Sequence, residues 1–253
     1  MKLFWAVLSK ELREQWRTYR FLVTLIVLSL FGLLSPLLAY FTPQILQSIP
    51  GVEGLSEVIP PPTVLDAIGQ YIKNLSQFAI LFAILLPMGS VSGEKERGTA
   101  ALVLSKPLPR GAFLLAKAAA YGLVFALSLL IAGLAGYYYT ALLFEALPFD
   151  RWLVMNGLLW LYAMVYLTLT LLFSTLSRSQ AVAAGLSFAV LLGLGVVGIS
   201  QTVAVYLPAQ LINWSAMLFI QPQSAYWGSL AVSTGMIVLA LLAAWLVFRR
   251  QEL

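Results

Sequence analysis

Long uncharged, strongly apolar runs alternate with short charged clusters along this sequence. The runs begin near residues 21, 74, 118, 152 and 179, and ionisable residues separate each from the next. A helix needs about 20 apolar residues to cross a bilayer. The run 179–248 is too long for one span, and polar residues and prolines interrupt it between 201 and 222, so it predicts two.

The pattern therefore predicts an all-α membrane protein with six transmembrane helices. The expected spans are 21–41, 75–93, 113–139, 153–176, 180–200 and 225–248. They divide the chain into an interfacial helix over 1–20 and a transmembrane domain over 21–253. The domain contains a loop over 93–112 on one side and two segments on the other side, 42–74 and 201–224. Thr63 is expected to cap a separate outer helix that reaches about Lys73.

An even number of spans places both termini on one side of the membrane. Of the 15 Lys and Arg residues, only Lys73 and Arg151 lie on the opposite side in this arrangement. Basic residues are enriched in cytoplasmic loops, so both termini and the loop 93–112 are predicted to face the cytoplasm. Because the formal charge of +5 follows the membrane in this way, it does not indicate binding to nucleic acid.

Composition excludes several kinds of chemistry. Hydrophobic residues make up 61% of the chain and charged residues only 10%, which fits a lipid-embedded body. Cysteine and histidine are absent, so disulfides, the usual zinc sites and a Ser-His-Asp triad are excluded. We expect no catalytic residue and no metal site in this chain.

Residues 2–20 predict an amphipathic helix that lies along the cytoplasmic membrane surface. Two Trp and two Leu residues share one face at helical spacing, and basic residues occupy the other face. The residues assigned to this helix are Trp5, Leu8, Leu12, Arg13, Trp16 and Arg17. The alternative is a basic anchor that only sets the topology.

The loop 93–112 carries the most informative segment. A charged cluster (Glu94, Lys95, Glu96, Arg97) is followed by Gly98, where we expect the helix to break. Thr99 can then cap a short helix over 100–105, which ends before Pro107. That helix exposes Leu102 and Leu104 on the cytoplasmic side. Such side chains favour docking into a groove of a soluble partner, and the alternative is that they rest on the membrane surface.

These residues carry a family resemblance. The sequence Gly-Glu-x-Glu-x-Gly-Thr over 93–99, followed by Ser-Lys-Pro-Leu-Pro-Arg over 105–110, resembles the type 2 class of ABC exporter permeases, including the permease of nitrous-oxide-reductase maturation. The six spans and the N-terminal helix are similar to that class as well. The resemblance implies that the loop forms a coupling helix that receives the motion of an ATPase. The coupling residues would be Glu94, Lys95, Glu96, Arg97, Gly98, Thr99, Leu102 and Leu104.

The resemblance also implies partners and a location. A cytoplasmic ABC ATPase subunit would bind ATP and magnesium, and this chain would bind no cofactor. A second permease copy, identical or related, would complete a dimer, and an extracytoplasmic accessory protein is a possible further partner. The location implied is a prokaryotic inner membrane, where the chain crosses several times in contact with membrane lipid.

The sequence predicts no nucleotide-binding site and no ion-coupling site in this chain. Residues 93–99 read G-x-x-x-x-G-T, which is close to a phosphate-binding loop but lacks its lysine. No acidic residue or arginine is expected at the centre of a span, which disfavours a secondary transporter. Lys117 is expected to reach the membrane surface from a helix end. A lipid-modifying enzyme is disfavoured because Glu94 and Glu96 are the only close acidic pair on the inner side.

The fifth expected span carries small residues at every fourth position, a spacing that suits close contact between helices. The four residues are Ala181, Gly185, Ala189 and Gly193. They predict either the interface with a second permease copy or ordinary packing within the chain.

The sequence as a whole favours an exporter permease driven by a separate ATPase. The alternative within the same family is mechanical transmission of ATPase motion to an accessory protein outside the membrane. No motif indicates a substrate-binding residue.

Overall fold

The computed structural model describes residues 2–48, 60–96, 98 and 110–251, which form helices, turns and no strand. Six helices are long and apolar enough to cross a membrane: α2 (Arg20–Gln47), α3 (Val64–Leu85), α6 (Arg110–Leu143), α7 (Phe149–Leu176), α8 (Gln180–Val197) and α11 (Trp227–Arg250). The shorter helices are α1 (Lys2–Arg17), α4 (Ser92–Glu96), α9 (Gln201–Ala204) and α10 (Ala209–Ile220). The predictions of an all-α fold and of six spans are confirmed.

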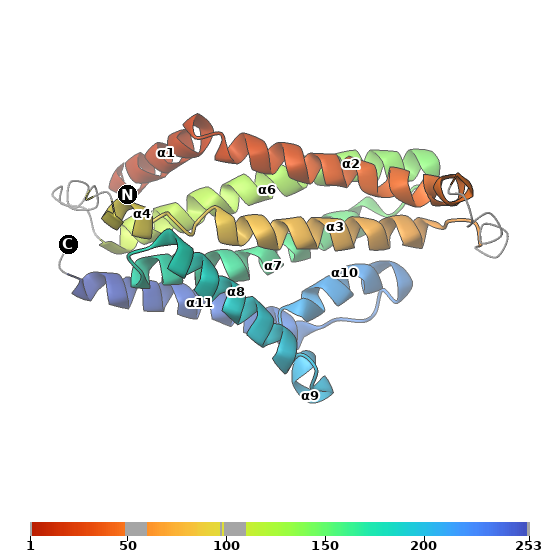
Figure 1. The fold of residues 1–253 in the computed structure, drawn as a ribbon. Coiled ribbons are helices and arrows are strands. Elements are labelled where there is room, and N and C mark those ends of the chain that lie inside the picture. The colour runs from red at the N-terminus through yellow and green to blue at the C-terminus, as the bar shows by residue number, and fades with distance from the viewer. Residues whose placement is uncertain (1, 49–59, 97, 99–109, 252–253) are drawn as a thin grey trace.

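The six long helices form one elongated bundle (Figure 1). Both ends of the chain lie at the same end of the bundle, together with α1 and α4. The end of α2, the start of α3 and the link from α6 to α7 lie at the other end, and α8 leans away from the bundle toward α9. The side of the membrane that each end faces stays a prediction from the distribution of basic residues.

The core of the bundle lies around α7, which is the most buried of the six candidate spans. The Tyr71 hydroxyl in α3 donates a hydrogen bond to Oδ1 of Asn156 in α7 at 2.7 Å. Trp152 Nε1, also in α7, donates to the carbonyl of Gly133 in α6 at 2.9 Å. In an apolar environment a buried polar group needs a partner, so these bonds fix the register of α3, α6 and α7.

α1 is separated from α2 by Thr18 and Tyr19. Tyr19 has a φ of 59° and lies in the left-handed region, and no other non-glycine residue in the described segments has a positive φ. Beyond this turn α1 is set at an angle to α2 and leads to the end of the bundle where α4 lies (Figure 1). Its position along a membrane surface stays a prediction.

The boundaries of α3 differ from the expected ones. An outer helix ending near Lys73 and a span beginning at residue 75 were expected, but α3 runs without a break from Val64 to Leu85. Lys73 is exposed on its outer surface, so its charge does not interrupt the helix. The start is capped as expected, because the Thr63 amide donates to Asp66 Oδ2 at 2.7 Å. Pro87 lies in the turns that follow α3.

α2 and α6 approach each other most closely at glycines. A Cβ atom on Gly32 would lie 2.6 Å from the carbonyl oxygen of Ala132, and one on Gly136 would lie 3.0 Å from the carbonyl oxygen of Gly32. Such distances are shorter than van der Waals contact allows. The two helix backbones therefore lie close together only because these positions have no side chain.

Gly32→Ala is expected to destabilise the bundle by roughly 1–3 kcal/mol, because the added methyl group must push the backbones of α2 and α6 apart. The matched control is Gly235→Ala in α11, where a Cβ atom would meet no other atom within 4 Å. The control should be neutral, or stabilising by up to about 1 kcal/mol through helix propensity. Thermal unfolding of the two variants in one detergent measures the difference, and equal midpoints would contradict the close α2–α6 contact.

Candidate functional site: the junction of α1, α4 and α6

α4 is a short helix that is held against the end of α7. The amides of Val91 and Ser92 both donate to Oγ of Ser174 at 3.1 Å. Lys95 Nζ donates to the carbonyl of Thr175. Ser92 and Ser174 are fully buried. The segment that leads into the predicted coupling helix is therefore fixed to α7.

Lys95 lies in a partly desolvated position. Burial lowers the pKa of its side chain, and the positive charge of Arg178 lowers it further. The ammonium form is thus less favoured here than in water, and the bond to the Thr175 carbonyl offsets part of that cost.

α1 packs on the start of α6. Val7 and Leu8 are buried in a cluster with Phe113 and Leu114. Glu11, one turn further along the same side of α1, is only 2% exposed. A carboxylate in such a position requires a positive partner or several hydrogen-bond donors.

Lys117 in α6 is that partner. Its Nζ lies 3.1 Å from both carboxylate oxygens of Glu11 and 2.9 Å from Oε1 of Glu94 in α4. The lysine is 1% exposed, so the expectation that it extends to the membrane surface is wrong. The carboxylates of α1 and α4 compensate the positive charge of Lys117, which α6 alone would leave without a counter-charge.

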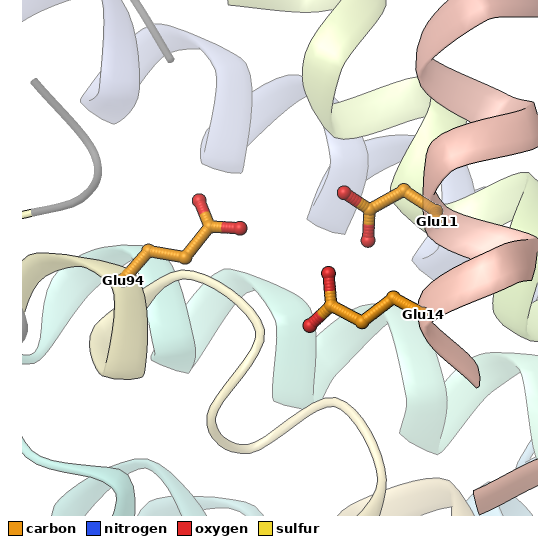
Figure 2. Close-up of side chains that lie close together, drawn as sticks. All are labelled: Glu11, Glu14 and Glu94. Carbon is orange, nitrogen blue, oxygen red and sulfur yellow. The ribbon is translucent and has the colours of Figure 1, made fainter. Parts of the chain in front are cut away.

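Lys10 and Glu14 complete the cluster at its rim. Lys10 Nζ lies 3.3 Å from Glu11, 3.8 Å from Glu14 and 3.7 Å from Glu94. Figure 2 shows the three carboxylates directed toward a common space between α1 and α4. Because the Lys10 side chain is 46% exposed, its contacts contribute little compared with those of Lys117.

The three carboxylates could be read as a metal site, since each offers an oxygen and these oxygens lie within 4.8 Å of one another. The ammonium group of Lys117 already lies within 3.1 Å of two of the carboxylates. A metal ion in the same space would be repelled by that positive charge. The arrangement is therefore an ion-pair junction between three helices.

A second set of bonds joins α6, α7 and α11 at the same end. One terminal nitrogen of the Arg110 guanidinium donates to the carbonyls of Phe248, Arg249 and Gln251, at 2.7–2.9 Å. The Gln251 side chain donates to the Thr175 carbonyl at 3.0 Å, the same atom that accepts from Lys95. The ends of α4, α6, α7 and α11 are thus connected through Lys95, Arg110, Thr175 and Gln251.

The expected coupling residues lie partly in this junction. Glu94 and Lys95 are half-buried in α4, and Glu96 is exposed. Gly98 follows with a φ of 67°, a left-handed conformation that suits glycine at a break. Arg97, Thr99, Leu102 and Leu104 lie outside the described residues. The coupling role of all eight stays a prediction.

The structure divides the expected apolar face of α1. Leu8 is buried against the protein, whereas Trp5 and Trp16 are 62% and 57% exposed. Leu12 is half-buried, and Arg13 and Arg17 are exposed. The two tryptophans are thus directed away from the bundle, and their contact with a membrane surface stays a prediction.

The small-residue ridge of α8 does not pack within the described part of the chain. All four of its residues are exposed: Ala181, Gly185, Ala189 and Gly193. α8 contacts the bundle through its other side, where Ala183 and Ser187 are buried. Whether a second copy covers the ridge stays a prediction.

A cavity of about 290 Å³ opens between α7, α8 and the segment 204–213. Tyr162 and Tyr166 of α7 form one wall, and Leu191 and Gly195 of α8 form another. The aromatic rings of the two tyrosines are 5.3 Å apart and edge to face. The cavity thus combines apolar walls with phenol groups and contains no charged lining residue.

The junction residues Glu11, Lys117 and Ser174 were not identified from the sequence. A lone lysine in an apolar run and a glutamate on the inward side of an amphipathic helix were the available signals. The pairing of Glu11 with Lys117 depends on the packing of α1 against the start of α6, which no local sequence pattern predicts.

Comparison with known proteins gives a consistent result. The sequence profile of the family described as ABC-2 family transporter protein matches residues 5–253. The chain is 28% identical over 264 residues to "Uncharacterized transmembrane protein YxlG" of Bacillus subtilis (strain 168), covering 100% of this chain and 99% of that protein.

Two further relatives carry the name "Probable ABC transporter permease protein NosY". The protein from Pseudomonas aeruginosa is 36% identical over 132 residues, which cover 52% of this chain and 43% of that protein. The protein from Stutzerimonas stutzeri is 29% identical over 198 residues, which cover 75% and 66% of the two chains. The resemblance based on residues 93–110 is thereby confirmed at the level of the family.

Lys117→Met is expected to destabilise the protein by roughly 3–5 kcal/mol, because it leaves Glu11 and Glu94 without their buried counter-charge. Lys10→Met is the matched control and should cost about 0–1 kcal/mol. Thermal unfolding in detergent measures both effects. Adding Glu11→Gln and Glu94→Gln to Lys117→Met should recover much of the loss. Equal effects of the two lysine substitutions would show that the junction is not the stabilising interaction.

Proposed function

Because this chain belongs to the ABC-2 family of transporter permeases, we propose that it couples ATP hydrolysis by a separate cytoplasmic ATPase to the outward movement of a substrate. The chain is a multi-pass membrane protein and the membrane subunit of an ABC transporter. The proposal adds the coupling route, the direction of transport and the partners.

The observation that carries the proposal is the attachment of α4 to both α6 and α7. Glu94 binds Lys117 of α6, and Val91 and Ser92 bind Ser174 of α7. A force applied to the segment after α4 therefore acts on two spans at once. α6 has 34 residues and is about 50 Å long, so a displacement at its start can be carried beyond the roughly 30 Å hydrocarbon core.

The ATPase is proposed to dock on the segment 99–106 and to bind ATP and magnesium itself. Two permease copies, identical or related, would form the transport unit. The exposed ridge of α8 supports a place for the second copy, because its small residues allow close approach of another helix. Closure of the ATPase would then shift the arrangement of the helices between two states.

Docking and coupling can be separated by two kinds of variant. Leu102→Asp and Leu104→Asp are expected to release the ATPase from the inserted permease, because a charge replaces the docking side chain. Ser174→Ala should keep the ATPase bound but lower its stimulation by the permease about fivefold or more, since α4 loses its two amide contacts with α7. Co-purification and ATP hydrolysis in proteoliposomes measure the two properties.

The control for Ser174→Ala is Ser187→Ala in α8, whose hydroxyl donates to the carbonyl of Ala183 in its own helix. This variant should retain both properties. Full binding of the ATPase to both aspartate variants would refute docking at 99–106. Normal stimulation in Ser174→Ala would refute the route through α7.

The cavity beside Tyr162 and Tyr166 is proposed to hold part of the substrate. Its size is at the lower end of ligand pockets, and its lining suits a neutral, amphipathic molecule. α8, which forms one wall, is the least buried of the candidate spans.

Gly195→Leu is expected to abolish transport of the substrate while ATPase binding is retained. A Cβ atom at this position meets no other atom within 4 Å, so a side chain can be added to the cavity lining without displacing the backbone. The control is Gly157→Leu in α7. A Cβ atom at Gly157 also meets no other atom within 4 Å, and Gly157 does not line the cavity. Transport in Gly195→Leu equal to that of the control would exclude this cavity.

The alternative is that the permease transmits ATPase motion to an extracytoplasmic accessory protein and moves no cargo. Under this alternative, Ser174→Ala should still lower the stimulation of ATP hydrolysis, because the same contacts between α4 and α7 transmit the motion. The alternative would leave Gly195→Leu fully active in accessory-protein assays.

A further inference from the structure

An apolar groove lies between α6 and α11 on the outside of the bundle. Its volume is about 360 Å³, and its lining includes Gly111 and Leu115 of α6 and Val238, Leu242 and Trp245 of α11. Leu115 and Leu242 are 51% and 48% exposed. The groove is therefore open to the surrounding lipid along its length.

One end of the groove is strongly basic. Arg110 directly precedes Gly111, and the guanidinium carbon of Arg249 lies 5.2 Å from the ring centroid of Trp245. Arg249 and Arg250 are exposed. In the part of the chain that the structure describes, none of these three arginines pairs with a carboxylate.

Arg110 is held in position by the rest of the fold. One of its terminal nitrogens donates to three carbonyls at the end of α11. A guanidinium carries five N–H donors in a planar fork, so the other nitrogens keep donors beyond those three bonds. The contact also brings the start of α6 and the end of α11 together, which closes the groove at its basic end.

We propose that this groove binds one anionic phospholipid. An acyl chain lies along Leu115 and Leu242, and the phosphate group lies at the level of Arg249 and Arg250. Basic pockets between membrane helices on the cytoplasmic side favour anionic headgroups, and tryptophan is enriched at that depth. The distribution of basic residues along the chain predicts the cytoplasmic leaflet for this end.

Charge complementarity distinguishes this groove from another apolar one. The groove on α7 and α8 is lined by Phe173, Leu186, Ala189 and Gly193, with no basic residue in its lining or directly beside it in the sequence. Nothing in its lining favours an anionic headgroup. The α6–α11 groove, in contrast, has arginines at the end of an acyl-chain path.

The test uses the full-length chain in detergent, titrated with phosphatidylglycerol or with phosphatidylcholine of the same acyl composition, and bound lipid is counted by native mass spectrometry. One phosphatidylglycerol should bind in preference to phosphatidylcholine. Arg249→Gln with Arg250→Gln should weaken phosphatidylglycerol binding about tenfold or more. The control is Lys73→Gln with Arg151→Gln, which removes the same charge from the side predicted to be extracytoplasmic and should leave binding unchanged.

A second pair of variants tests the acyl-chain path. Leu115→Trp should fill the groove and reduce binding of the tight lipid, whereas Leu127→Trp, an exposed position on the same helix outside the groove, should not. Equal binding of the two lipids to the unmodified chain would overturn the proposal. Unchanged binding in both the arginine and the Leu115→Trp variants would also overturn it.

Discussion

The ammonium group of Lys117 holds together two carboxylates that belong to separate parts of the chain. Glu11 arrives on the N-terminal helix and Glu94 arrives on the segment after the second span. In a desolvated position each of these three charges would be costly alone. Their mutual contact makes the position of α1, the position of α4 and the start of α6 depend on one another.

This dependence explains how a short segment outside the spans can be held firmly to the helices of the membrane domain. α4 is too short to be stable by itself, and its contacts with Lys117 of α6 and with Ser174 and Thr175 of α7 help to hold it in place. A helix with few residues but several buried polar contacts can transmit displacement without a large interface. That property suits a subunit whose family works with an ATP-binding partner.

The lipid-facing body was predictable because the bilayer imposes a length and a polarity on every span. The limits of α3 were not, because a charge such as Lys73 ends an apolar run without ending a helix. The partners of Lys117 were not predictable either. Periodicity places Glu11 on one side of α1, but only the packing of that helix against α6 decides whether this side faces water, lipid or protein.

The bend at Tyr19 places a bulky residue in a conformation that L-amino acids disfavour by about 1–2 kcal/mol. A straight continuation of α2 into α1 would remove that strain. The strain is compensated because the turn places Glu11 beside Lys117, and α6, which carries Lys117, has no acidic residue of its own. The N-terminal helix thus supplies the counter-charge of a buried lysine in another helix, and the strained residue just before the first span is the conformational cost of that arrangement.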